Sequence, residues 1–219
     1  MAKLVVFGAG DIARLAHFYF SSDSEHEVVA FTVDAAYKKA SEFQGLPLVA
    51  SEEVVRLFPP SDVRMFVALS YAKMNRIRAE KYTHFKGLGY QLVSYVSSRC
   101  SYLSQHPPGD NCFILEDNTV QPFVTIGNDV TLWSGNHIGH DSSIGDHCFI
   151  SSHVVVSGHV SVGPSCFIGV NATLRNSIAI AERTLIGAGA VIMKNTTPGS
   201  VYPGPRAERM SKTSDQLDV

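Results

Sequence analysis

Between residues 114 and 192, aliphatic side chains recur at every sixth position without interruption. A helix repeats its faces every 3.6 residues and a strand every 2, so neither element produces this period. Glycine often follows the aliphatic residue, and the fourth residue after it is almost always small or aliphatic. Each hexad therefore predicts a short strand with a tight turn, and three hexads predict one triangular coil of a parallel β-helix. The fourteen aliphatic positions are Ile114, Val120, Ile126, Leu132, Ile138, Ile144, Ile150, Val156, Val162, Ile168, Leu174, Ile180, Ile186 and Ile192.

Stacked coils of such a helix lie about 4.8 Å apart, so residues that are 18 apart in the sequence should lie above one another. This rule stacks Cys166 on Cys148 at an inward position. We therefore expect these cysteines, and Cys112 two coils below Cys148, to be small core residues with free thiols. The same rule places Gly158, which has no side chain, directly above His140.

The first 95 residues carry a different pattern, in which apolar strands alternate with helical segments. Strands are expected over 4–7, 28–33, 46–49, 63–69 and 91–95, and helices over 11–20, 51–58 and 73–85. This order predicts a small, Rossmann-like, doubly wound parallel sheet. The predicted architecture is thus an α/β domain over residues 1–95, an all-β parallel β-helix over 96–207 and a polar tail over 208–219.

The turn after the first strand contains Gly8-x-Gly10-x-x-Ala13 at the start of a helix. Glycines let a diphosphate approach the backbone, and the helix N-terminus supplies free N–H groups and a favourable dipole. Asp34, which ends the second strand, is placed to accept hydrogen bonds from a ribose or a base. A turn without a ligand and an NAD site are the alternatives, but the domain is too short for both halves of a dinucleotide fold.

Composition narrows the possible partners. The chain has 219 residues, 45% of them hydrophobic, and a formal net charge of -2 at pH 7. This charge gives no reason to expect nucleic acid or an anionic membrane as a partner. The first residues lack the pattern of a signal peptide, and no apolar run approaches the length of a membrane span. We therefore expect a cytoplasmic protein without membrane insertion.

Five of the nine histidines lie between residues 137 and 159. His147, His153 and His159 are six apart, so they should occupy equivalent corners on three different sides of the coil, and we expect no metal. His140 differs, because Gly158 leaves an open shelf with a backbone N–H above it. A base beneath an oxyanion donor is what acyl transfer from a thioester requires. Asp141 is placed to orient the imidazole of His140.

With these motifs, the chain resembles the PglD and NeuD family of bacterial sugar acyltransferases. The segments that carry the resemblance are 139–145, 156–163 and 186–192. The resemblance implies a left-handed coil, a homotrimer, and acetyl transfer from acetyl-coenzyme A to the amine of a nucleotide-linked amino sugar. It also implies that His140 is the base, that Asp141 is its acidic partner, and that the Gly158 amide contacts the acetyl group.

Two positions depart from the family, because Ile12 and Phe149 stand where many members carry histidine. Trp133, Asn136 and His137 are predicted local substitutes for sugar recognition. The predicted nucleotide-sugar site comprises Gly8, Gly10, Asp11, Ile12, Asp34, Ser70, Asn136 and His137. The predicted acetyl-coenzyme A site comprises Gly158, Gly187, Gly189, Lys194 and Arg206.

The sequence therefore predicts an N-acetyltransferase of surface-glycan biosynthesis that uses acetyl-coenzyme A and works by direct attack, without a metal. One alternative is O-acetylation of a sialic-acid-like sugar, which the same base could serve. The other is a non-catalytic trimeric scaffold that binds a nucleotide through its N-terminal domain.

Overall fold

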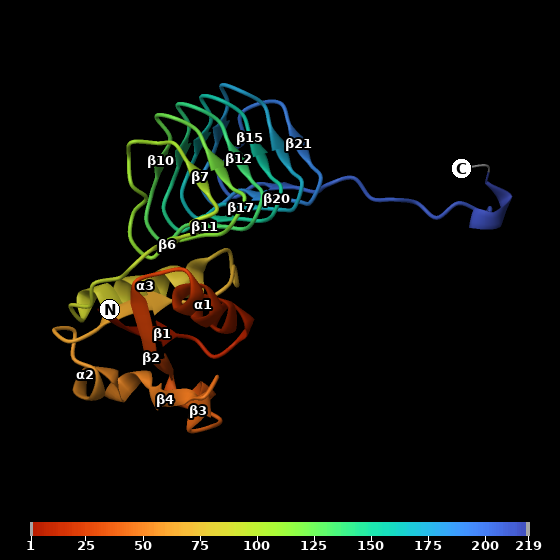
Figure 1. Cartoon of the computed structure of the whole chain (residues 1–219). Coiled ribbons are helices and arrows are strands. Elements are labelled where there is room, and N and C mark those ends of the chain that lie inside the picture. The colour runs from red at the N-terminus through yellow and green to blue at the C-terminus, as the bar shows by residue number, and fades with distance from the viewer. Residues whose placement is uncertain (1, 218–219) are drawn as a thin grey trace.

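The structure is a computed structural model that describes residues 2–217, in which an α/β part is followed by a β-helix (Figure 1). Four parallel strands form the first sheet, with an antiparallel strand at its edge in the order β3-β4-β2-β1-β5. The strands are β1 (Ala2–Phe7), β2 (His26–Val33), β3 (Glu42–Phe43), β4 (Leu46–Ala50) and β5 (Arg64–Val67). The helices are α1 (Asp11–Ser22), α2 (Val54–Leu57) and α3 (Arg76–Gly87), with 3-10 turns at Ala35–Tyr37 and Ser51–Glu53. The predicted α/β fold is confirmed.

Two predicted elements differ from the observed ones. The helix expected from residue 73 begins at Arg76 instead, because Lys73, Met74 and Asn75 lie in the left-handed region, with φ values of 52°, 55° and 63°. The strand expected over 91–95 is reduced to a single bridge between Leu92 and Met65. The chain leaves the first sheet there, because the Tyr95 N–H instead donates to the Cys112 carbonyl of the β-helix at 2.8 Å.

The β-helix consists of two-residue strands in three sheets. Sheet 1 contains β6 (Tyr95–Val96), β8 (Phe113–Ile114), β11 (Thr131–Leu132), β14 (Phe149–Ile150), β17 (Phe167–Ile168), β20 (Leu185–Ile186) and β22 (Val201–Tyr202). Sheet 2 contains β7 (Ser101–Tyr102), β9 (Thr119–Val120), β12 (His137–Ile138), β15 (Val155–Val156), β18 (Thr173–Leu174) and β21 (Val191–Ile192). Sheet 3 contains β10 (Thr125–Ile126), β13 (Ser143–Ile144), β16 (Ser161–Val162) and β19 (Ala179–Ile180).

The register of these sheets follows the 18-residue rule. Thr131 pairs with Phe149, and Phe149 pairs with Phe167, in a parallel ladder. All fourteen aliphatic positions are buried in one continuous core, together with Cys112, Cys148 and Cys166. The cysteines are free thiols, and burial raises the pKa of Cys112 to about 12. The predicted left-handed parallel β-helix, with its cysteines in the core, is confirmed.

The turns show a second feature that repeats every six residues, which is a left-handed backbone conformation. From residue 117 to residue 189, the third residue after each aliphatic position has a positive φ. Asn, Asp and His are several-fold enriched in this left-handed region, and glycine adopts it freely. His147, His153 and His159 all occupy this corner position, with φ values of 61°, 57° and 57°. Turn geometry therefore accounts for their spacing of six.

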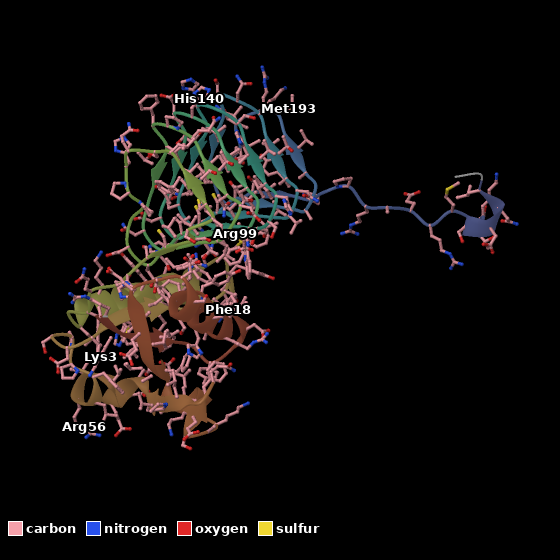
Figure 2. All side chains as sticks on the ribbon, viewed as in Figure 1. Lys3, Phe18, Arg56, Arg99, His140 and Met193 are labelled. Carbon is pink, nitrogen blue, oxygen red and sulfur yellow. The ribbon has the colours of Figure 1, made fainter. Side chains whose placement is uncertain are left out.

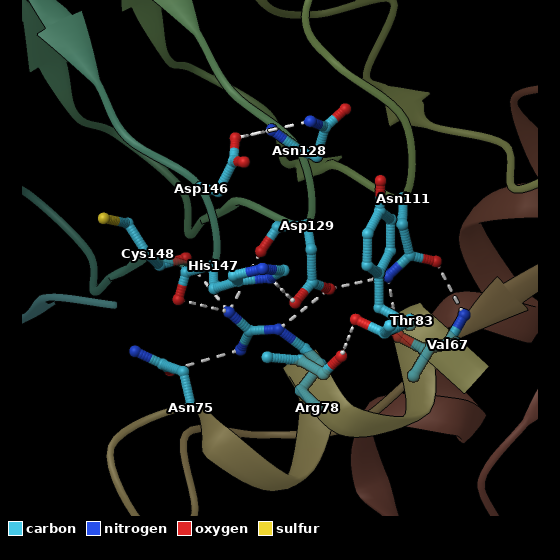
Figure 3. A network of polar contacts seen from close by, with 12 residues as sticks. Val67, Asn75, Arg78, Thr83, Asn111, Asn128, Asp129, Asp146, His147 and Cys148 are labelled. Atoms are coloured by element: carbon cyan, nitrogen blue, oxygen red, sulfur yellow. Dashed lines mark hydrogen bonds and ion pairs between the residues drawn. The ribbon is translucent and has the colours of Figure 1, made fainter. Parts of the chain in front are cut away.

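The α/β part covers sheet 1, and a buried polar network joins the two (Figure 3). The Arg78 side chain, on α3, is 2% exposed and pairs with the Asp129 carboxylate at 3.1 Å. Its guanidinium also donates to the Asp129, His147 and Cys148 carbonyls, at 3.0, 3.0 and 3.2 Å. The second oxygen of Asp129 lies 2.9 Å from His147 Nδ1. These contacts hold α3 against the β-helix.

Beyond β22 the chain extends away from the body and carries a short 3-10 turn at Ser214–Gln216 (Figure 1). The two longest helices, α1 and α3, have 12 residues each. Over residues 2–217, no helix combines the length and apolar character needed to cross a membrane.

Candidate active site and nucleotide cavity

His140 lies in the turn between β12 and β13, at the corner that joins sheet 2 to sheet 3. Its side chain is 52% exposed. Because the α/β part covers sheet 1, this corner is the one opposite the covered face. Figure 2 shows His140 at the edge of the β-helix away from Lys3 and Arg56 of the α/β part.

The ring of His140 is oriented by Asp141. Its Nδ1 lies 2.8 Å from Asp141 Oδ2, and a carboxylate can only accept, so the proton is on Nδ1. The Nε2 lone pair then faces Gly158, because a Cβ placed on Gly158 would come within 2.8 Å of Nε2. The imidazole of His140 thus lies beneath an open shelf at Gly158, as the 18-residue rule predicted.

The shelf also offers a donor. Among the hydrogen bonds of residues 2–217, none uses the Gly158 N–H. Gly139, one coil below, helps to leave this amide uncovered, since a Cβ there would come within 2.5 Å of the Gly158 nitrogen. An imidazole and an uncovered N–H thus lie on adjacent coils at one corner.

A separate cavity of about 350 Å³ lies at the carboxyl ends of β1, β2 and β5. The predicted residues Gly8, Asp34 and Ser70 line it together. Asp34 also contacts Lys81, a residue of α3 that sequence reasoning missed, at 2.5 Å from Nζ to Oδ1. Because Lys81 lies in the middle of a helix remote in sequence from the glycine turn, no motif pointed to it. Its ammonium gives the cavity a cation suited to phosphate.

The charge state of Asp34 follows from these neighbours. Partial burial favours its neutral form, but hydrogen bonds from the Lys81 ammonium and the Ser51 hydroxyl outweigh this effect. They hold the pKa of Asp34 below its ordinary value, so the carboxylate is ionised at neutral pH.

The steric and backbone constraints differ between the two glycines of the turn. Gly8 has φ +130°, and a Cβ there would lie 2.7 Å from the Ala68 carbonyl oxygen, so the fold requires it. A Cβ on Gly10 would meet nothing within 4 Å. Protein packing therefore does not explain Gly10, which also does not line the cavity.

A second hollow of about 340 Å³, here called the aromatic groove, lies where sheet 1 meets the loop after β5. Tyr71, 51% exposed, packs its ring 5.0 Å from that of Phe149 and 4.7 Å from that of Phe167. Trp133 lines the same groove. Ser70 precedes Tyr71 and lines the cavity, so one loop borders both hollows.

The other residues predicted to bind the nucleotide sugar are placed as follows. Asn136 is 1% exposed, and its side chain donates to the Trp133 carbonyl and accepts from the Val154 N–H. The predicted sugar contact by Asn136 is therefore wrong, because the amide is used to satisfy the turns of adjacent coils. His137 lies on sheet 2, beside Val155.

At the glycine turn, the Asp11 side chain is 88% exposed and pairs with Arg14 at 3.2 Å. Ile12 packs its side chain against the core of the α/β part. Neither Asp11 nor Ile12 lines the cavity.

The residues predicted to bind acetyl-coenzyme A are spread over the C-terminal coils. Gly187 and Gly189 flank the exposed Ala188, and the Gly187 N–H donates to the Tyr202 carbonyl at 2.8 Å. Lys194 is exposed just after β21, and Arg206 is exposed on the extended segment beyond β22.

Comparison with known proteins supports the repeat and the fold. Residues 123–158 match the family model of the bacterial transferase hexapeptide (six repeats). A curated relative is the acyl-[acyl-carrier-protein]--UDP-N-acetylglucosamine O-acyltransferase of Burkholderia lata, 27% identical over 84 residues. That match covers 38% of this chain, and the chain spans about a third (32%) of the relative's length.

Solved structures match almost the whole chain. The acetyltransferase domain of PglB from Neisseria gonorrhoeae superposes with a TM-score of 0.82 at 21% identity, covering 92% of this chain and 96% of the domain. PerB from Caulobacter crescentus, solved with CoA and GDP-perosamine, superposes with a TM-score of 0.80 at 22% identity, covering 92% and 93%. The resemblance to sugar acyltransferases is thus confirmed in the fold of both parts.

Proposed function

We propose that this protein is an acetyl-coenzyme A-dependent N-acetyltransferase that acts on the amine of a nucleotide-linked amino sugar. The observation that carries the proposal is the corner at His140, where an oriented imidazole faces an open shelf with a free N–H. PerB, which has the same fold, was solved with CoA and a nucleotide-linked sugar. We place the reaction in the cytoplasm and in the synthesis of surface glycans.

The reaction begins when the sugar amine attacks the carbonyl carbon of the thioester. His140 Nε2 accepts the amine proton, and Asp141 stabilises the resulting imidazolium. The Gly158 N–H donates to the oxyanion of the tetrahedral intermediate. The C–S bond then breaks, and the imidazolium returns its proton to the leaving thiolate. The products are the amide and the free thiol of coenzyme A, and no covalent enzyme intermediate forms.

The acceptor reaches His140 from another copy of the chain. The nucleotide cavity lies in the α/β part that covers sheet 1, whereas His140 lies at the opposite corner. A sugar bound in the cavity therefore faces away from the base of its own chain. Sheet 2 also exposes apolar residues, with Val155 39% and Val191 61% exposed. A cyclic homotrimer covers such faces and brings each cavity towards a neighbour's base.

The aromatic groove is the proposed path of the sugar. It begins at Tyr71, beside the cavity, and its walls are the rings of Trp133, Phe149 and Phe167. Aromatic faces pack against the C–H faces of pyranoses, so the groove would hold the sugar ring while the nucleotide stays in the cavity. The same base would serve a hydroxyl acceptor, and parallel assays with amino and hydroxyl sugars distinguish N- from O-acetylation.

Mixing of two inactive chains tests this proposal. His140→Ala removes the base but keeps the cavity, while Gly10→Val fills the phosphate approach but keeps the base. Each variant alone should be inactive in acetyl transfer. Co-expressed trimers should regain about one quarter of wild-type activity, because one interface in four combines an intact cavity with an intact base. Mixed trimers that stay inactive would place both halves of the site in one chain and contradict the proposal.

A further inference from the structure

His140 and Asp141 meet a third side chain, His159, from the next coil. The ligand atoms of these three residues all lie within 4.8 Å of one another. Asp141 Oδ2 is 2.8 Å from His140 Nδ1 and 3.9 Å from His159 Nε2. The two imidazole rings are nearly perpendicular, at 88°, with centroids 5.0 Å apart. All three side chains are between 42% and 59% exposed, so an ion can reach them from solvent.

The donor set suits a transition metal. Two imidazole nitrogens and one carboxylate oxygen are ligands that Zn²⁺ prefers, whereas Mg²⁺ and Ca²⁺ favour sites made of oxygen alone. Tetrahedral ligands at about 2.1 Å from Zn²⁺ lie roughly 3.4 Å from one another. The two separations from Asp141 Oδ2, 2.8 and 3.9 Å, lie on either side of this value, and all three ligand atoms lie within 4.8 Å of one another, so side-chain rotations can bring them to this spacing.

The backbone holds the three residues in place. Asp141 and His159 occupy the same left-handed corner position on successive coils, both with φ 57°. The His159 N–H donates to the His140 carbonyl at 2.9 Å, which ties the two coils together at this point. The corner histidines at 147 and 153 belong to other corners, and neither is in this cluster. The cluster therefore forms because the 18-residue register stacks His159 on Asp141, and the spacing of six between the corner histidines does not explain it.

We propose that His140, Asp141 and His159 bind Zn²⁺ or a similar divalent transition-metal ion, and that the bound ion inhibits acetyl transfer. In the metal-free protein, His140 Nδ1 carries a proton and donates a hydrogen bond to Asp141. A metal ion on Nδ1 displaces this proton. A neutral imidazole retains one N–H, so this proton moves to Nε2, the atom that faces Gly158. His140 then donates towards the thioester and cannot accept the amine proton. The inhibitory part rests on the proposed function, whereas metal binding does not.

Binding is tested by titrating the full chain, without a polyhistidine tag, with Co²⁺ and following its visible absorption. Wild type should bind one ion per chain, and Zn²⁺ should displace it. His159→Gln should weaken binding at least about tenfold, since even partners outside the first coordination shell contribute 10- to 100-fold. His153→Gln is the matched control, because His153 is exposed and has the same φ of 57°. Unchanged Co²⁺ binding in His159→Gln would overturn the site.

Inhibition is tested by acetyl transfer at buffered free Zn²⁺, with the acetylated product separated by chromatography. Each rate is divided by the rate of the same variant in EDTA. Wild type and His153→Gln should lose activity reversibly, and His159→Gln should resist. Equal inhibition of all three chains, or Co²⁺ binding without inhibition, overturns the inhibitory role. Failure of the proposed function looks different: no acetyl transfer occurs even in EDTA, and Co²⁺ binding alone then decides the metal site.

Discussion

The corner that carries His140 and the cavity that carries Asp34 position their side chains by different means. At the corner, each residue comes from the same or the next coil, and one register of 18 residues brings His140 beneath Gly158. In the cavity, Gly8, Asp34 and Lys81 come from three elements that meet only when the sheet and α3 pack together. The proposed chemistry at the corner therefore depends on local geometry, and the proposed binding in the cavity depends on tertiary packing.

This contrast predicts which substitutions should change turnover and which should change stability or nucleotide binding. A substitution at the corner should change turnover and leave stability almost intact, because the coils continue above and below it. A substitution in the packing of α3 should change stability or nucleotide binding and leave the base untouched.

The largest effect is expected for His140→Ala. Loss of a general base should lower the turnover number by about 10² to 10⁴, with a Michaelis constant little changed. Steady-state acetyl transfer with nucleotide-linked amino sugars measures both constants. His153→Ala removes an exposed histidine at another corner and should keep nearly full activity. If His140→Ala kept half of wild-type turnover, the assignment of the base would be wrong.

Arg78→Met should produce the largest loss of stability. It leaves the Asp129 carboxylate, which is 0% exposed, without its guanidinium partner. Breaking a buried pair in this way costs about 3–5 kcal/mol in the free energy of unfolding. Arg99→Met is the matched control, because the Arg99–Asp117 pair is 70% and 60% exposed and should contribute about 1 kcal/mol or less. Denaturant unfolding compares them, and equal losses would contradict a packing role for Arg78.

Gly158→Ala should lower turnover without loss of the fold. The added Cβ would lie 2.8 Å from His140 Nε2, on the shelf where the proposed reaction places the thioester carbonyl. We expect a loss of about 10², comparable with removal of one oxyanion donor. Acetyl-transfer rates and thermal unfolding are measured on the same preparation. A variant with normal turnover would mean that the acetyl group binds elsewhere.

The smallest effect is expected for Lys81→Met, which removes the cation from the cavity. Affinity for a nucleoside diphosphate should fall about tenfold to hundredfold, as for the loss of a charged hydrogen bond. Isothermal titration calorimetry measures this affinity. Lys86→Met is the control, because Lys86 lies on the same helix but pairs with Asp110 outside the cavity. Similar affinities in the two variants would exclude Lys81 from phosphate binding.

How far the sequence could predict the molecule depended on the range of the contacts involved. The stacking of Gly158 on His140 followed from counting residues, because every coil repeats the register of the one below. Asn136 shows the limit of that reasoning. A polar residue near the base suggested a sugar contact, but its amide is buried and bonds the Trp133 carbonyl and the Val154 N–H.

By itself, the sequence determined the repeat, the inward aliphatic positions, the α/β pattern of the first part and the glycine turn after β1. These features depend on local periods and on backbone conformations that few residue types adopt. The tertiary structure alone decided that Lys81 reaches Asp34, that Arg78 is buried against Asp129, and that His159 approaches Asp141. It also decided that the cavity and His140 lie on opposite sides of the coil. Such contacts arise from tertiary packing. The periodicity of a sequence shows which face of a helix is apolar, but it does not show which sheet that face packs against.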